Sequence, residues 1–172
     1  MFTQAAAKTL VDYKAWADGL TLEAVAALPA AEVHRERPTL FRSIIGTLNH
    51  SYVVDLIWRA HLLGEDHGFT SRREILHPEI GALRQAQTAC NDWLADWCAL
   101  QTDATLASPV EFEFVSGDRA CMTRGAILFH MVNHATYHRG WVSDLFFQIP
   151  AKPPTTDFSV YPYALSEIGG PP

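Results

Sequence analysis

Three histidines stand four residues apart in the last third of the sequence: His130, His134 and His138. In a helix, residues four apart lie on the same face, about 6 Å from each other along the axis. Imidazole nitrogen is a common ligand of divalent transition metals, and two rings one helical turn apart can bind the same ion. The spacing therefore predicts a metal site if this segment is helical.

The apolar pattern indicates which of these histidines face the core. Residues at alternating steps of three and four, typical of a buried helix face, are Ile127, Met131, His134, His138, Trp141 and Leu145. Two neighbouring buried rings need a polar partner, and a shared divalent ion supplies one. His130 and His138 are about 12 Å apart along a helix, too far to bind one ion together. The spacing alone leaves His130/His134 and His134/His138 open as the pair; the apolar pattern favours the second and makes His130 a packing or second-layer residue.

A third candidate ligand is His50, in a segment where a helix is expected over residues 43–63. The apolar face of this helix comprises Gly46, His50, Val53, Ile57 and Ala60, so that His50 also occupies a core position. Two ligands from one helix and one from another leave an open coordination position on a four-coordinate ion. This is the pattern of catalytic rather than structural metal sites.

The other histidines lie in or beside polar connections, and we expect them to be solvated: His34, His61, His67 and His77. Trp58 and Trp141 are close in sequence to the candidate ligands and are expected to line a pocket. Hydrolase-triad, P-loop and Rossmann motifs are absent from the sequence.

The elements that position these residues are four predicted helices, over residues 3–27, 43–63, 78–100 and 123–148. Residues 64–77 are polar and should cross the bundle, so that neighbouring helices can be parallel. Alternation in residues 110–115 and 119–122 predicts a β-hairpin with a turn at Ser116–Asp118. The proline-rich residues 151–172, with Tyr163 and Leu165, are expected to lie extended against the bundle. The sequence thus predicts a single all-α domain, 1–172, with a short β-hairpin before the last helix.

Composition excludes several classes of protein. The formal net charge is −6, from 13 basic and 19 acidic residues, which disfavours a nucleic-acid partner. No run approaches the roughly 18 apolar residues of a membrane span, and the N-terminus lacks a secretory pattern, so a cytoplasmic location is expected. The three cysteines, Cys90, Cys98 and Cys121, include no C-x-x-C pair and are expected to be free thiols.

Three stretches together resemble the DinB-like family: Tyr13–Asp18, Ser43–Trp58 and His130–Gly140. This likeness implies a four-helix bundle of up-up-down-down connectivity, usually a homodimer, with a divalent ion on three histidines. Carried over residue by residue, the ligands are His50, His134 and His138. Where the family often has glutamine after its Arg-Gly pair, this chain has Trp141, which changes the polarity of the pocket.

Family members with known activity imply a small thiol such as bacillithiol, mycothiol or glutathione, and thiol S-transfer as the reaction. The alternatives are a metal-dependent hydrolase and a non-catalytic, stress-associated metal-binding dimer. Arg139 and Asn133 are candidates for orienting the site or an anionic group on a small-molecule substrate. Three imidazoles suit zinc or nickel best here, and iron or manganese is also compatible.

Overall fold

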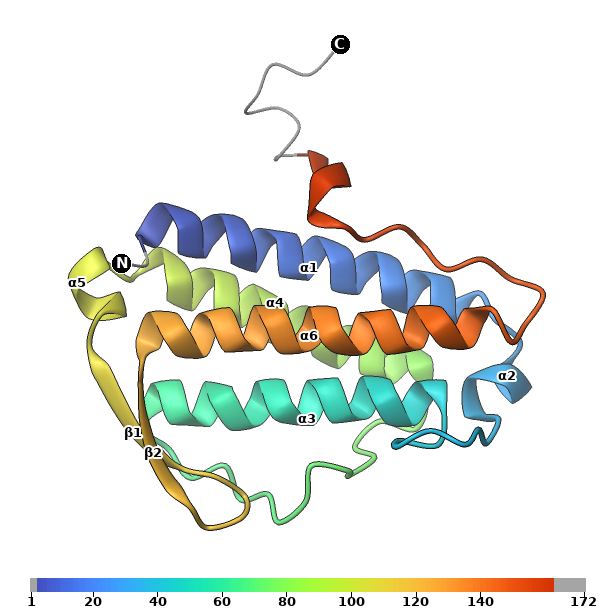
Figure 1. Ribbon diagram of the computed structural model, residues 1–172, viewed down its shortest axis with the longest axis horizontal. Helices are drawn as coiled ribbons and strands as arrows, with labels where there is room; N and C mark the ends of the chain where they lie inside the picture. Colours follow the sequence, from blue (N-terminus) through green and yellow to red (C-terminus); the bar gives the residue numbers. More distant parts are fainter. Residues whose placement is uncertain (1–2, 163–172) are drawn as a thin grey trace.

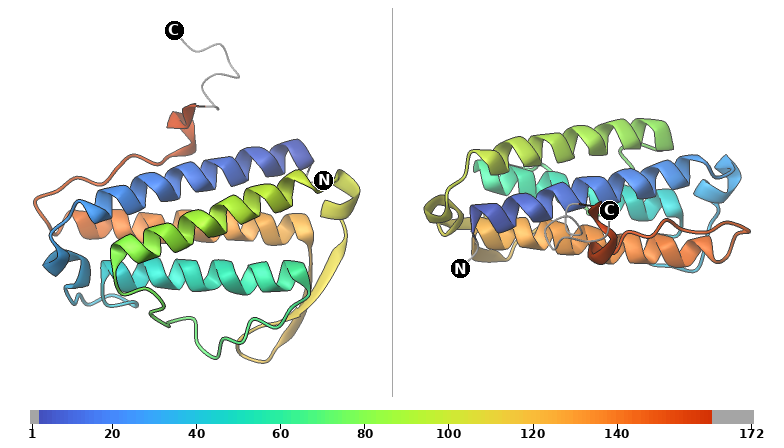
Figure 2. Two further views of the ribbon diagram at one scale, coloured as in Figure 1. Left: turned by 180° about the vertical axis from the view of Figure 1, so that it is seen from behind. Right: turned by 90° about the horizontal axis from the view of Figure 1, so that it is seen from above.

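Four long helices lie side by side over residues 3–162, the part of the chain that the computed structural model describes (Figures 1 and 2). They are α1 (Gln4–Ala26), α3 (Ile44–Leu63), α4 (Ile80–Ala99) and α6 (Arg124–Phe146). The predicted all-α bundle is confirmed.

The helix ends follow the capping residues in the sequence. The side chains of Ser43 and Thr123 each accept a hydrogen bond from the backbone N–H three residues further along, which caps α3 and α6. Gly64 ends α3 in the left-handed conformation, with φ of 71°. Pro78 was expected in the first turn of the third long helix, but α4 begins two residues later, at Ile80.

The directions of the helices differ from the up-up-down-down order that we expected. One core cluster joins the first half of α1 and α6 to the second half of α3 and α4, through Val11, Leu128, Leu62 and Leu94. The other joins the opposite halves, through Leu22, Val142, Leu48 and Leu83. The order along the chain is therefore up, down, down, up, as Figure 1 shows. The connection between α1 and α3 stays at one end of the bundle, so these two helices are antiparallel. Residues 64–79 run back along the length of the bundle, so the helices that they join, α3 and α4, are parallel.

Short elements fill the connections: α2 (Ala30–His34), α5 (Asp103–Leu106), β1 (Pro109–Glu113), β2 (Arg119–Thr123) and the 3-10 helix η1 (Phe158–Val160). The two strands pair antiparallel, with Val110 opposite Met122, and this confirms the predicted hairpin. Gly117 supplies the positive φ of 90° in its turn. The sequence did not predict α2, α5 or η1, because single helical turns are too short to show an apolar period.

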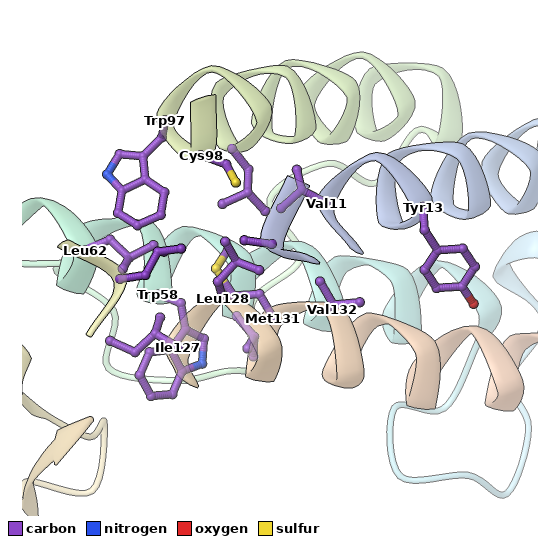
Figure 3. Packing of buried hydrophobic residues seen from close by; sticks show 14 of the residues in the cluster. Val11, Tyr13, Trp58, Leu62, Trp97, Cys98, Ile127, Leu128, Met131 and Val132 are labelled. Atoms are coloured by element: carbon purple, nitrogen blue, oxygen red, sulfur yellow. The ribbon is translucent and has the colours of Figure 1, made fainter. Parts of the chain in front are cut away.

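Side chains from all four long helices meet in the core (Figure 3). Beside it, the C-terminal segment packs on α1, as expected: the hydroxyl of Tyr13 donates a 2.7 Å hydrogen bond to the carbonyl of Thr156, and the ring of Phe158 lies edge-on to the ring of Tyr13. Tyr163 and Leu165, also expected in this contact, lie outside the described residues.

Neither a disulfide nor a helix able to span a membrane occurs within residues 3–162. The predicted free thiols are confirmed: Cys90 and Cys98 are buried, and Cys121 is exposed on β2.

Candidate metal centre

The structure brings together the three histidines singled out in the sequence. His50 comes from α3, and His134 and His138 come from α6; one ring nitrogen of each lies within 4.8 Å of the other two. The ring centroids of His134 and His138 are 4.3 Å apart, and that of His50 is 4.6 Å from His138. Ligands of a tetrahedral ion with bonds of about 2.1 Å are about 3.4 Å apart, so small side-chain movements suffice to close the group around an ion.

The position of His50 depends on a close backbone contact before α3. Phe41 stacks on the His50 ring, with centroids 4.0 Å apart and planes 15° apart. The carbonyl oxygen of Phe41 lies directly against Gly46, where a Cβ atom would collide with it. The glycine in this first turn therefore lets the preceding segment approach α3 and cover His50.

A second contact fixes the proton on His50. Its Nδ1 lies 2.7 Å from the main-chain carbonyl oxygen of Arg72. Because a carbonyl oxygen only accepts, Nδ1 carries the hydrogen and donates, which leaves the lone pair on Nε2. Metal-binding histidines commonly donate their second ring nitrogen in this way.

The environment keeps the imidazoles neutral. Burial, followed by the neighbouring His138 and His50, lowers the pKa of His134 to about 2. Burial and then His50 lower the pKa of His138 to about 4. The pKa of His50 is also lowered, chiefly by burial. Neutral imidazole is the form that binds a metal, so all three rings are ready as ligands near pH 7.

The residues present fit a divalent ion. The donor set is three neutral imidazoles, which suit late transition metals. The buried Nδ1 atoms of His134 and His138 find no hydrogen-bond partner within residues 3–162. Buried polar atoms without a hydrogen-bond partner destabilise a fold, so a metal ion or another polar partner at this site would stabilise it.

His130 stands outside this group. Its ring packs against Trp58, with centroids 4.9 Å apart, and lies one turn from His134. This agrees with a packing role. The expectation that His61 is solvated is wrong: the side chain is only 8% exposed, because Trp58 and Phe112 of β1 pack against it. His34 is exposed, as expected.

A cavity of about 720 Å³ opens onto the three histidines. Its wall includes Phe41 and both tryptophans expected there, Trp58 and Trp141. A volume of this size accommodates a typical small organic ligand.

The two candidate orienting residues do not line this cavity. Asn133 is exposed on α6 and faces a separate groove beneath residues 152–158. Arg139 is buried, and its guanidinium donates to Asp18 at 2.7 Å and to Thr136 at 2.8 Å. Arg139 and His138 both line a separate, small cavity of about 20 Å³.

Behind the histidines lies a buried charge network that the sequence analysis did not identify. The ammonium of Lys14 donates to Asp18 at 2.9 Å, to Asp55 at 2.7 Å and to Asn91 at 2.8 Å. Gln87 donates to Asp55 and so joins α4 to the network. Two cations, counting Arg139, balance two carboxylates, so the network has no net charge. Lys14, Asp18, Asp55 and Arg139 fall within the three stretches that resemble the DinB-like family, but the spacing of Lys14 and Asp18 is equally typical of a surface ion pair.

Comparisons with known proteins agree with this architecture. The chain matches the model of the DinB family over residues 1–168. It is 27% identical over 163 residues to Protein DinB of Bacillus subtilis (strain 168), covering 88% of this chain and 91% of that protein. The crystal structure of a DinB-like protein from Bacillus cereus superposes with a TM-score of 0.66 and 17% identity, over 90% of this chain and 99% of the other, which is a likeness of fold. Since the family match spans nearly the whole sequence, the chain belongs to the DinB family.

Proposed function

We propose that this protein binds a divalent metal ion through His50, His134 and His138 and acts as a metal-dependent thiol S-transferase. The observation that carries the proposal is the group of three neutral imidazoles, with ring nitrogens within 4.8 Å of one another, in the wall of a cavity of about 720 Å³. Zinc or nickel suits this donor set.

A catalytic role is supported by the number of ligands. Structural zinc sites are closed by four protein side chains, whereas catalytic sites use three and leave a position for a water or a substrate. The group within residues 3–162 has three members, and it adjoins a cavity rather than solid core.

A bound ion would supply Lewis acidity, which lowers the pKa of a coordinated thiol. Burial keeps the three rings neutral, the carbonyl of Arg72 orients His50, and Phe41, Trp58 and Trp141 line the cavity beside them. In the transfer, a bond forms between the thiol sulfur and an electrophilic carbon. The bond from that carbon to its leaving group breaks, the electron pair departs with the leaving group, and the thiol proton passes to solvent.

The test is conjugation of monochlorobimane to glutathione, bacillithiol or mycothiol by zinc-loaded and nickel-loaded protein. We expect conjugation that disappears after removal of the metal and in His138→Ala, while His130→Ala, which alters a ring outside the group, retains it. A loaded protein that neither conjugates nor binds any of these thiols would show that the transferase assignment is wrong. Turnover of ester or amide substrates with water alone would instead identify a hydrolase.

The homodimer implied by the family likeness stays a prediction. Light scattering coupled to size-exclusion chromatography measures the mass directly, and twice the chain mass of 19.1 kDa is the expected result.

A further inference from the structure

The cavity above the three histidines has an unusual balance of charge. Its wall includes two arginines, Arg72 and Arg73, and no aspartate or glutamate among the described residues. The whole chain carries six more acidic than basic residues. The charged side chains of this cavity are therefore positive, in a chain whose net charge is negative.

Both guanidinium groups lack an ion-pair partner within residues 3–162. Five other arginines in this part of the chain pair with carboxylates, among them Arg37 with Glu32 and Arg139 with Asp18, whereas Arg59, Arg84 and Arg124 also form no ion pair there. The fork of donors on Arg72 and Arg73 therefore remains available to a ligand.

The two arginines are exposed, and the main chain of Arg72 contacts the metal centre. The carbonyl of Arg72 accepts the hydrogen bond from Nδ1 of His50, and the N–H of Arg73 donates to the hydroxyl of Ser71 at 3.1 Å. The connection between α3 and α4 is thus attached to the site that it borders.

Much of the remaining wall is apolar or aromatic, and Ser71, Ser116, His61 and His130 add polar side chains. Phe41, Trp58, Trp141 and Tyr137 contribute aromatic rings, and Leu40 is 53% exposed beside them. An apolar wall with a few convergent polar groups is typical of a site for a small organic molecule. Three neutral imidazoles would not compensate the charge of a bound divalent ion. Any compensating negative charge would come from the small molecule that occupies the cavity.

We propose that this cavity binds an organic anion: a small molecule with an apolar body that packs against Phe41, Trp58 and Trp141, and an oxyanion group that Arg72 and Arg73 hold. This names the class of the substrate that the proposed transferase modifies, and to that extent it rests on the proposed function. Carboxylate and phosphate both match the donors of two guanidinium groups.

The experiment is isothermal titration calorimetry with three probes that share one body: 4-phenylbutyrate, 3-phenylpropylphosphonate and the neutral 4-phenylbutanol. The variants are Arg72→Gln and Arg73→Gln, singly and together. Arg72→Gln keeps the main-chain carbonyl that holds His50. The matched control is Arg84→Gln, which removes the same charge from an exposed position on α4 that borders a different groove.

We expect at least one of the two acids to bind the zinc-loaded protein about tenfold more tightly than the alcohol. Each arginine variant should weaken acid binding by about 3- to 10-fold and leave alcohol binding unchanged, and Arg84→Gln should change neither. The acid that binds identifies the oxyanion. Equal affinity for the alcohol and both acids, unchanged acid binding in the double variant, or no binding of either acid at millimolar concentration would overturn the proposal.

Repeating the titrations with metal-free protein separates this inference from the proposed function. If no metal binds but acid binding still depends on the two arginines, the transferase fails and the anion site holds. If thiol conjugation is found but the acids show no dependence on the arginines, the anion site fails alone.

Discussion

His50 and Arg72 are joined by a 2.7 Å hydrogen bond from the imidazole Nδ1 to the main-chain carbonyl oxygen. This single contact has two effects. It places the hydrogen on Nδ1, so Nε2 is the nitrogen with a free lone pair, and it attaches the connection between α3 and α4 to the same ring. One interaction therefore connects the ring that would bind a metal to the main chain of the arginine that would bind a substrate anion.

Replacing Lys14 by methionine should destabilise the fold strongly. The ammonium is fully buried and pairs with Asp18 and Asp55. Asp18 would keep Arg139 as a partner, but Asp55 would be left as a buried charge without a cation. Burial already raises the pKa of Asp55 in the intact network, with the opposing effect of Lys14 too small to offset it. We expect a loss of about 3–5 kcal/mol in the free energy of unfolding, measured by urea denaturation.

The chain contains a matched control for this substitution. Lys8 and Asp12 form an ion pair with the same spacing on the same helix, but the Lys8 side chain is 60% exposed. Lys8→Met should cost less than about 1 kcal/mol. Adding Asp55→Asn to Lys14→Met should recover part of the loss, because it removes the unpaired charge. Equal effects of Lys14→Met and Lys8→Met would contradict the description of the network.

Gly46→Ala should disturb the cover over His50. The new Cβ atom would collide with the carbonyl oxygen of Phe41, which is backbone and cannot rotate away. We expect about 1–3 kcal/mol of destabilisation and weaker metal affinity, because Phe41 must move off the ring of His50. Gly19→Ala is the control: α1 has open space there, and this substitution should stabilise the protein by about 0.5–1 kcal/mol. Thermal unfolding of both variants checks the difference, and similar behaviour of the two would count against the predicted collision.

Metal-free protein should lose stability as the pH falls below about 6.5. The pKa of His138 is lowered to about 4, by burial and then His50, and that of His134 to about 2. Between the unfolded pKa of about 6.5 and pH 4, the unfolded chain binds protons that the folded protein does not. Each fully buried ring therefore lowers the free energy of unfolding by at most about 1.4 kcal/mol per pH unit, and the partly exposed His134 by less.

Urea denaturation of metal-free protein between pH of about 7.5 and about 5 measures this slope. His138→Asn should flatten it, whereas His34→Asn, at an exposed position on α2, should leave it unchanged. A slope that is the same in all three proteins would show that His138 does not contribute.

The candidate site was largely readable from the sequence because its signals are local. His134 and His138 are one turn apart, and their place in an apolar period marked them as inward-facing; the same period marked His50. The starts of the predicted helices at residues 43 and 123 agree with the caps at Ser43 and Thr123, since a cap depends on only a few neighbouring residues.

The charge network, the burial of His61 and the helix directions were not predicted, because they depend on contacts between segments that are distant in the sequence. A lysine and an aspartate four residues apart are typical of a solvated helix face, and only the approach of Asp55 and Asn91 shows that Lys14 and Asp18 lie in the core. His61 was expected to be solvated because its cover, Phe112, is about fifty residues away. The helix directions likewise depend on which of the connections crosses the bundle. The amino-acid composition of a connection does not specify whether it crosses.

The central claim is that His50, His134 and His138 bind one ion together, and elemental analysis of purified protein tests it most directly. We predict one divalent ion per chain in the wild type, near-complete loss in His50→Ala, His134→Ala and His138→Ala, and full retention in His130→Ala, because His130 lies outside the group. Circular dichroism shows whether each variant remains folded. Full metal content in a folded His50→Ala variant would contradict the account.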